Sequence, residues 1–232
     1  MFKSKLFRRD PEKYKDLHIG CAPGTHAAVV NIVQQHVPHK TSLLDIGAHS
    51  GALLARFADT GYTDLAAADL DTTVFKLPSV PITRIDANQP FAHLFDRTFN
   101  VIVTTDVVEH LDSPRQFLAE ARKLLADGGH LAFSVPNIAF WEGRVKFALQ
   151  GEHWGFGAGH YRAQRHISPL WLPFYLADRK RTLGESLIFL AQKAPPEEDL
   201  RHPWDYRERW DASSRPDAPT HAATPRSPQS QH

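Results

Sequence analysis

Short apolar segments, each bounded by polar or turn-forming residues, recur through the first half of the chain. They cover residues 42–46, 65–70, 82–85 and 99–104. Segments of this kind are typical of strands that are buried on both faces of a sheet. Apolar residues at helical spacing follow the first segment from Ala52 onward, and strands that alternate with helices predict a parallel sheet. We therefore expect an α/β domain built on an open parallel sheet.

The regions on either side of these segments define the predicted domain organisation. Residues 1–40 are expected to be a polar lead-in followed by a helix over 25–36, with Thr25 as its N-cap and Pro38 as its stop. Residues 41–194 form the predicted domain. Residues 195–232 are rich in Pro, Ser, Arg, Asp and His and too poor in apolar residues to form a core, so we expect a disordered tail.

The segment that joins the first strand to its helix, residues 43–51, carries the strongest chemical signal. Gly47 and Gly51 flank the turn, and glycine lets a backbone approach a ligand without a Cβ in the way. The free N–H groups at the start of the helix favour an anionic group. The turn therefore predicts a nucleotide-type ligand, although an ordinary strand-to-helix turn explains the same pattern.

Polar residues also end the later strands. Asp69 stands about twenty residues after Gly47, the offset at which an acidic side chain accepts hydrogen bonds from a ribose. The residues that follow the other two strands are Asp86, Ala87, Thr105 and Asp106. Because the carboxyl ends of parallel strands meet at one edge of the sheet, we expect a single ligand site there.

Other enzyme classes with similar turns do not fit. His49 occupies the position where the dinucleotide fingerprint G-x-G-x-x-G requires its middle glycine. No Gly-Lys-Ser/Thr sequence is present, so a P-loop is absent. Residues 184–187 lack the second glycine of a nucleophile elbow. These observations exclude nicotinamide dehydrogenases and P-loop enzymes and argue against α/β-hydrolases.

An ordered series of motifs over residues 18–193 resembles the class I S-adenosylmethionine-dependent methyltransferases, in particular the small-molecule branch of methyltransferase type 11/23. The motifs are the first turn at 44–51, the acidic 67–69, the third motif at 85–87, the central block at 99–137 and the Arg-His-Ile-Ser-Pro run at 165–169. The resemblance implies a Rossmann-like, doubly wound, mostly parallel sheet with helices on both faces.

The same resemblance implies a helix over 117–126 and a final strand over 187–191. The chain departs from the family pattern after Pro169. Residues 171–182 form a single short apolar segment that runs into charged residues. Whether the sheet is one strand short at its C-terminal end therefore stays open.

The resemblance implies S-adenosyl-L-methionine as the cofactor and a role for each strand end. The first turn would hold the methionyl part, the second strand end the ribose, the third the adenine, and the fourth would lie near the sulfonium. The expected cofactor-binding residues are Asp45, Gly47, His49, Gly51, Asp69, Leu70, Asp86, Ala87, Thr105 and Asp106.

Histidines supply the candidates for acid–base chemistry. A base is needed only where the acceptor is a hydroxyl or a protonated amine, and histidine titrates near neutral pH. His110 is the catalytic candidate, and His160 and His166 are expected to face the substrate. Glu109 and His110 could instead simply hold the loop and the following helix. His153, His160 and His166 lack the carboxylate or cysteine partners of a specific metal site, so no metal is expected.

Composition limits the partners and the compartment. The net charge of +1 argues against a general nucleic-acid footprint, so methylation of RNA is an alternative without support from the sequence. The resemblance implies a small-molecule acceptor. Cys21 is the single cysteine, which predicts a reducing compartment, and no apolar run is long enough to span a membrane. We expect a cytoplasmic protein whose oligomeric state stays open.

The sequence therefore predicts a methyltransferase that acts on a small-molecule or glycan-type acceptor, most plausibly at oxygen. The alternative is a non-catalytic binding or regulatory module with the same fold, which His49 and the shortened C-terminal region motivate. Methyl transfer to any acceptor would exclude this alternative.

Overall fold

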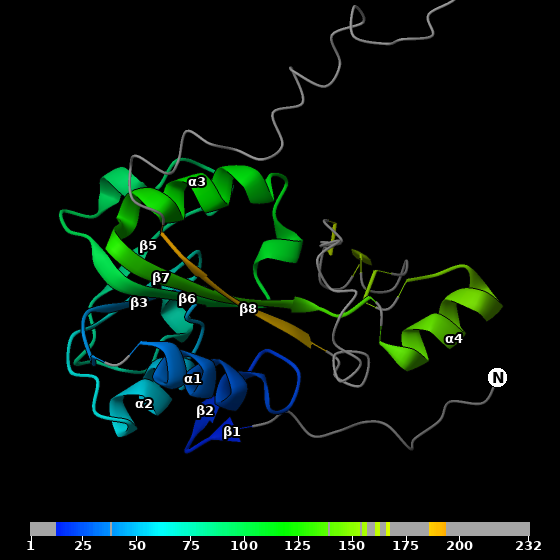
Figure 1. Cartoon of the computed structure of the whole chain (residues 1–232), viewed down its shortest axis with the longest axis horizontal. Helices are drawn as coiled ribbons and strands as arrows, with labels where there is room; N and C mark the ends of the chain where they lie inside the picture. Colours follow the sequence, from blue (N-terminus) through cyan, green and yellow to red (C-terminus); the bar gives the residue numbers. More distant parts are fainter. Residues whose placement is uncertain are drawn as a thin grey trace, which may run out of the picture. The chain divides into compact units, whose positions relative to one another are not determined.

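A six-stranded sheet forms the centre of the protein in the computed structural model of the chain (Figure 1). The structure describes residues 13–37, 39–138, 140–153, 155–156, 161–162, 166–167 and 186–193. In spatial order the strands are β5 (Ile82–Arg84), β4 (Leu65–Asp69), β3 (Leu43–Ile46), β6 (Phe99–Thr105), β7 (Leu125–Pro136) and β8 (Ser186–Gln192). All pairs are parallel except β7 with β8. The predicted doubly wound, mostly parallel sheet is confirmed.

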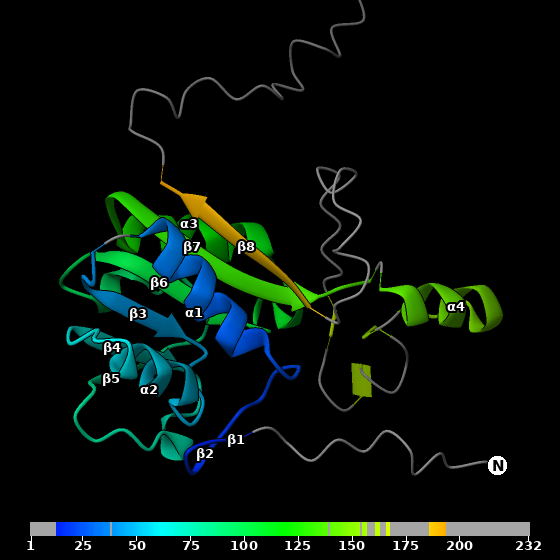
Figure 2. The same cartoon turned by 60° about the horizontal axis from the view of Figure 1, so that its bottom comes forward.

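Helices cover both faces of this sheet. α1 (Thr25–His36) and α2 (Ala52–Asp59) lie on one face and α3 (Pro114–Leu124) on the other, as Figures 1 and 2 show. Successive strand residues point to opposite faces. Leu43 therefore packs in the apolar cluster with α1 and α2, whereas Leu44 packs in the cluster with α3. Burial on both faces explains why the strands are almost entirely apolar.

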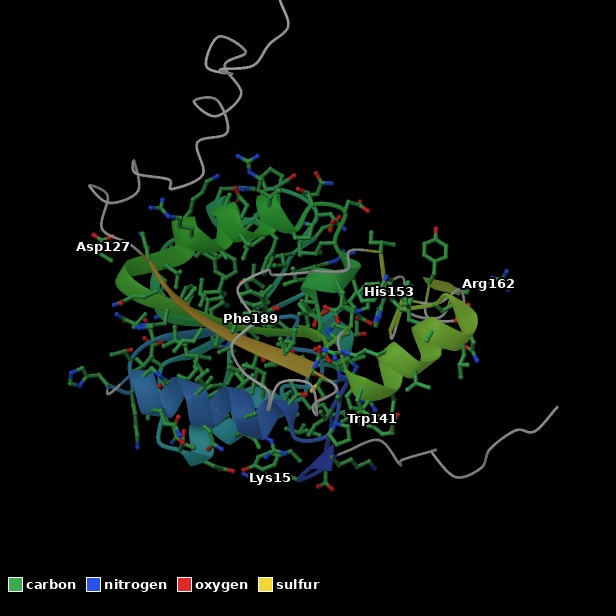
Figure 3. The ribbon with its side chains drawn as sticks, turned by 45° about the vertical axis from the view of Figure 1, so that its right-hand side comes forward. Lys15, Asp127, Trp141, His153, Arg162 and Phe189 are labelled. Atoms are coloured by element: carbon green, nitrogen blue, oxygen red, sulfur yellow. The ribbon has the colours of Figure 1, made fainter. Side chains whose placement is uncertain are left out.

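The antiparallel strand β8 extends the sheet at one edge. Phe189 stacks on Phe133 of β7, with ring centroids 4.7 Å apart. Figure 3 shows Phe189 on β8. At the opposite end of β7 from the cavity described below, Lys193 forms an ion pair with Asp127, with 3.2 Å between Nζ and Oδ1. The predicted final strand over 187–191 is confirmed and is one residue longer at each end.

The remaining elements are short. They are the hairpin of β1 (Lys13–Tyr14) and β2 (Leu17–His18), the 3₁₀ turns η2 (Thr72–Val74), η3 (Ala92–Leu94) and η4 (Val108–His110), and α4 (Trp141–Gln150). No helix among the described residues has the length and apolar character needed to cross a membrane. The hairpin is attached to α2, because Lys15 Nζ donates to Asp59 Oδ1 at 2.9 Å.

The predicted helix over 25–36 is confirmed at both ends, but its predicted N-cap is wrong. Gly24 precedes the helix in the left-handed conformation, with a φ of 86°, and no side chain caps the first turn. Thr25 is the first helical residue, and its hydroxyl donates to Ser186 Oγ at 3.3 Å. The Thr25 side chain therefore links α1 to β8.

The predicted helix over 117–126 is wrong at both ends. α3 begins at Pro114, because the Ser113 hydroxyl accepts the Gln116 N–H and proline is favoured in the first helical turn. The helix ends at Leu124, since Leu125 is already extended and pairs with Phe99. An apolar Leu-Leu pair fits a helix end and a strand start equally well, so the sequence pattern does not locate this boundary.

Several predictions fall on residues outside the described ranges. These include the tail over 195–232 and the segment 168–185, where an extra strand or its absence was left open. Among the described residues the sheet has six strands. The predicted domain boundaries after residues 40 and 194 stay predictions.

The order of the strands reverses direction at β3. Its two neighbours are β4 and β6, so the chain first proceeds to one side of β3 and later returns to the other. In open α/β sheets a ligand crevice forms at this switch point, outside the carboxyl ends of the strands. The fold therefore directs attention to the loops that follow β3, β4 and β6.

Glu120 of α3 is a buried carboxylate that holds the η3 turn in place. Its Oε2 accepts the N–H groups of Phe91 and Ala92, each at 2.9 Å, and Lys123 pairs with its Oε1.

We expect Glu120→Ala to lower the free energy of unfolding by about 1–3 kcal/mol, because buried N–H donors lose their acceptor. Urea denaturation measures this loss. The exposed Asp96→Ala is the control and should change stability by less than about 0.5 kcal/mol; equal effects would contradict the assignment.

Candidate active site

A cavity of about 580 Å³ opens at the carboxyl ends of the parallel strands. Its lining comes from the loops after β3, β4, β5 and β6 and from the segment between β2 and α1. A volume of this size lies within the range of small-molecule and cofactor sites. The position agrees with the single ligand site that the strand ends predict.

The predicted cofactor residues line this cavity with one exception. Those in the lining are Asp45, Gly47, His49, Asp69, Leu70, Asp86, Ala87, Thr105 and Asp106. The exception is Gly51, which is buried. A Cβ at this position would lie 2.8 Å from two atoms of Leu77 and 3.0 Å from one atom of Phe75. With a φ of 87°, Gly51 provides the left-handed residue that begins α2.

The turn after β3 is held to β4 by its own backbone. Gly47 and Ala48 both donate to the Ala68 carbonyl, at 2.8 and 3.2 Å. Gly47 has a φ of 83°, and a Cβ there would lie 2.3 Å from Val107 Cγ2. Glycine is therefore required at this position by both the backbone and the packing.

His49 keeps the turn geometry although it replaces the middle glycine of the motif. Its φ is 45°, in the left-handed region that glycine adopts at least cost. Its ring lies 5.4 Å from the ring of His18. His49 therefore adds a side chain to the cavity lining in a backbone conformation that glycine adopts readily.

Asp69 connects the turns after β3 and β4. Its Oδ2 accepts the His49 N–H at 2.7 Å, and its Oδ1 accepts the Asp71 N–H at 3.0 Å. Each carboxylate oxygen has two lone-pair directions, so acceptor capacity remains toward the cavity. The Leu70 side chain beside it is 59% exposed and lies in the cavity lining.

Asp45 is an unsatisfied buried carboxyl group. It is 1% exposed, and its Oδ1 has no hydrogen-bond partner among the described residues. Burial, and secondarily the charge of Asp69, raise the pKa of Asp45 to about 8. A cationic group bound beside it would supply the missing partner and stabilise its ionised form.

Thr105 and Asp106 form the floor of the cavity. Thr105 Oγ1 lies 3.4 Å from His26 Nε2. Asp106 has a φ of 50°, and its carboxylate accepts the Ser134 hydroxyl at 2.6 Å. Burial raises the pKa of Asp106, and the bond from Ser134 opposes that rise.

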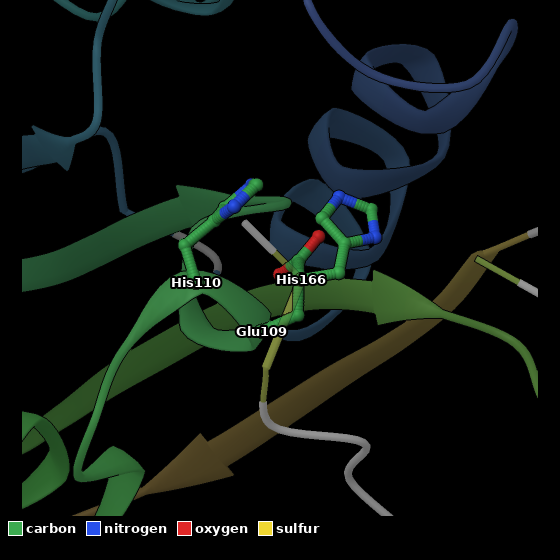
Figure 4. Close-up of side chains that lie close together, drawn as sticks. All are labelled: Glu109, His110 and His166. Atoms are coloured by element: carbon green, nitrogen blue, oxygen red, sulfur yellow. The ribbon is translucent and has the colours of Figure 1, made fainter. Parts of the chain in front are cut away.

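The predicted catalytic His110 also lines the cavity, and a predicted substrate residue lies next to it. The rings of His110 and His166 meet edge to face, with centroids 4.6 Å apart. Figure 4 shows both rings beside Glu109. Burial, and secondarily the charge of Asp106, raise the pKa of Glu109 to about 9. His160 lies outside the described residues, and His153 instead stacks on Phe147 of α4, at 4.6 Å.

Residues from the N-terminal segment that were not among the predicted site residues also line the cavity. His18, Gly20 and Cys21 lie in the predicted lead-in, and His26 lies in the predicted helix over 25–36. The Ser50 hydroxyl donates to the His18 carbonyl at 2.6 Å and so fixes this segment over the first turn. A two-residue strand has no periodic signal in the sequence. The contribution of this segment to the cavity could have been inferred only from the expected position of the helix over 25–36 next to the first strand.

A family model that describes a methyltransferase domain matches residues 4–177, which is most of the chain. The chain belongs to this methyltransferase family. The match confirms the family that the motifs predict and, with it, the expected class of S-adenosylmethionine-dependent methyltransferases. No curated protein shows a significant sequence match to this methyltransferase.

Solved structures similar to the methyltransferase include three from the same broad class. The glycopeptide N-methyltransferase MtfA is 21% identical, over 49% of this chain and 55% of that chain, with a TM-score of 0.42. The amino pentose methyltransferase CalS10 of Micromonospora echinaspora is 26% identical over 50% and 51%, with a TM-score of 0.42. The sugar N-methyltransferase KedS8 of Streptoalloteichus is 21% identical over 48% and 47%, with a TM-score of 0.41. The methyltransferase thus spans about half the length of these structures.

His26 is expected to stay neutral at physiological pH. Burial, and secondarily the charge of Arg56, lower its pKa from 6.5 to about 4. Because the folded value lies below the unfolded one, the stability contributed by the neutral ring is present above pH 6.5 and is lost as the pH falls through about 4. An NMR titration, assigned with His26→Gln, should place the midpoint near pH 4. A midpoint near 6.5 would contradict the burial argument.

The left-handed conformation of His49 predicts a simple order of stability among substitutions. His49→Gly should leave the free energy of unfolding unchanged or raise it. His49→Val should lower it by about 1–2 kcal/mol, because a β-branched residue tolerates this conformation poorly. Thermal unfolding of the pair measures the difference. Equal stability of the two variants would show that the turn is not left-handed at this position.

Proposed function

We propose that the protein transfers a methyl group from S-adenosylmethionine to a small-molecule or glycan-type acceptor, at oxygen. The observation that carries the proposal is the convergence of Asp45, Asp69 and Asp86 on one cavity at the switch point of the sheet. Carboxylates distributed along a cavity suit an extended ligand that carries hydrogen-bond donors at both ends and in the middle. Membership of a methyltransferase family narrows that ligand to the methyl donor.

The methionyl end of the cofactor fits the surroundings of Asp45. The buried Oδ1 lacks a partner, and an ammonium group is a donor that would satisfy it. Gly47, two residues along the chain from this carboxylate, lines the same cavity. Asp45 would therefore orient the amino-acid part of the cofactor.

The nucleoside part fits the next two strand ends. Asp69 has acceptor capacity left for the ribose hydroxyls after binding two backbone N–H groups. The exposed Leu70 side chain offers an apolar surface to the adenine ring, and Asp86 an acceptor for its amino group. Ala87 completes the adenine side.

The protein has a limited chemical task once donor and acceptor are bound. The cofactor supplies a methyl group on a positively charged sulfur. The chain must hold the acceptor in line with that methyl group and exclude water, and orientation of this kind is worth about 7–11 kcal/mol at most. His110 lines the cavity and can accept the proton of an acceptor hydroxyl.

The acceptor is proposed to be small and not a nucleic acid. The net charge of +1 provides no general electrostatic attraction for a polyanion. The cavity lining near His110 adds the polar side chains of Asp106 and Asp112 to apolar Leu111. A compact acceptor with hydroxyl groups suits such a lining.

The cofactor assignment predicts a matched pair of variants. Asp69→Asn should weaken S-adenosylmethionine binding by about 10–100-fold, the range for hydrogen bonds to a charged group worth about 1.5–3 kcal/mol. Asp71→Asn is the control, because this exposed carboxylate bonds Thr73 and lies outside the cavity lining. Calorimetric titration of the cofactor measures both.

The titration and an activity assay separate the possible outcomes. Binding that Asp69→Asn weakens and Asp71→Asn does not, followed by formation of S-adenosylhomocysteine with a hydroxylated acceptor, supports the proposal. Absence of cofactor binding would overturn it. Binding without transfer to any acceptor of a broad panel would favour the non-catalytic module.

A further inference from the structure

Three potential metal ligands converge at His110, a residue of the cavity lining. One ligand atom each of Glu109, His110 and His166 lies within 4.8 Å of the other two (Figure 4). Glu109 and His110 belong to the η4 turn after β6, whereas His166 comes from a segment far along the chain. The backbone joins the two segments, because the Ile167 N–H donates to the Glu109 carbonyl at 2.9 Å.

Glu109 is buried, and no ion pair to its carboxylate occurs in the described part of the chain. Its exposed fraction is 0%, and neither carboxylate oxygen has a hydrogen-bond partner among the described residues. A buried carboxylate is costly unless it is paired, protonated or bound to a metal ion. The side chain nevertheless faces two imidazoles, which are also good metal ligands.

His166 is oriented by a second bond in the way that metal-binding histidines usually are. Its Nδ1 lies 2.6 Å from the Gly155 carbonyl oxygen. A carbonyl only accepts, so Nδ1 must be the donor, and a neutral ring then carries its lone pair on Nε2. A backbone carbonyl that fixes the tautomer in this way is a common outer partner of a metal ligand.

We propose that Glu109, His110 and His166 bind a divalent first-row transition-metal ion such as Zn²⁺, Mn²⁺ or Co²⁺. Two imidazoles and one carboxylate suit these ions better than Mg²⁺ or Ca²⁺, which prefer oxygen ligands. Three protein ligands leave coordination positions open, and His110 places them next to the cavity. This triad was not evident in the sequence, where His166 was considered only with His153 and His160.

The ion would act on the acceptor, a step that rests on the proposed function. A His110 ring that binds the metal through its lone pair cannot accept a proton from the acceptor. The ion would then activate the acceptor in place of His110. An acceptor hydroxyl bound to the ion loses its proton to water more readily. Its oxygen then forms the new C–O bond as the C–S bond breaks, and the electron pair stays on sulfur. No oxidant or reductant is needed.

Cobalt spectroscopy tests the metal site without depending on activity. Full-length protein freed of metal with a chelator is titrated with Co²⁺. We expect one equivalent to bind with intense visible d–d absorption, Zn²⁺ to displace it, and Mg²⁺ at the same concentration to leave it in place. Absorption that saturates at no defined stoichiometry, or no absorption beyond that of aqueous Co²⁺, would overturn the proposal.

Variants of the triad identify the ligands. Glu109→Gln and His166→Gln are each expected to weaken Co²⁺ binding by at least about tenfold. The control is His153→Gln, because His153 stacks on Phe147 and is not part of the triad. Circular dichroism confirms that each variant is folded. Glu109→Gln conserves the shape of the side chain and replaces a buried ionisable group with a neutral amide, so a folded protein is expected. Unchanged binding in both triad variants would overturn the assignment.

The two proposals can fail separately. S-adenosylmethionine is titrated into the same metal-free and Co²⁺-loaded protein. Cofactor binding without a Co²⁺ spectrum would overturn the metal site and leave the proposed function standing. A Co²⁺ spectrum that the triad variants abolish, without cofactor binding, would support the metal site and overturn the proposed function.

Discussion

Parallel pairing of β3 with β4 on one side and β6 on the other is the constraint on which the site depends. The register aligns Asp45 with Ala67 and with Val103, so the three strands end close to the same level. The turn after β3 is further bound to β4 through the Ala68 carbonyl. Loops far apart in the sequence are thereby brought to one edge, and a ligand at that edge contacts all of them.

Buried acidic groups are the common chemical feature of this edge. Asp45 and Glu109 are buried. Within the part of the chain that the structure describes, Asp45 Oδ1 and both carboxylate oxygens of Glu109 have no hydrogen-bond partner, whereas the partly buried Asp106 accepts the Ser134 hydroxyl. Such groups are tolerated where a positive partner offsets their desolvation. A sulfonium cofactor with an ammonium group and a divalent ion are both positive. The two proposals therefore address the same electrostatic requirement, one at Asp45 and the other at Glu109.

The sequence predicts most of the sheet, and all but one of the predicted cofactor residues lie in the cavity lining, because both predictions depend on local signals. A short apolar segment that ends in an aspartate, as before Asp69, carries its own evidence of strand and site. The boundary between α3 and β7 was missed, because Leu124 and Leu125 suit either element. Thr25 was misjudged as an N-cap, because its hydroxyl has a tertiary partner that no local pattern reveals.

The neighbours that matter most for chemistry were the least predictable. His26 and Thr105 approach each other only because α1 packs against β6, β7 and β8. His166 reaches His110 only through a chain path whose length has no sequence signature. Local periodicity in the sequence predicts helices and strands, whereas these contacts depend on how the helices and strands are arranged in space. The residues of a site that come from separate loops are therefore visible mainly in three dimensions.

The contact between α1 and β8 has a consequence for the order in which the protein forms. Thr25 and Ser186 are 161 residues apart, and Ile188 and Leu190 pack on the apolar cluster that contains α1. During synthesis the first helix is made long before the strand that it contacts. Contacts across such a distance form late, because closing a long loop costs chain entropy. The helix that carries His26 into the cavity thus acquires its last neighbour only when the final strand of the sheet leaves the ribosome.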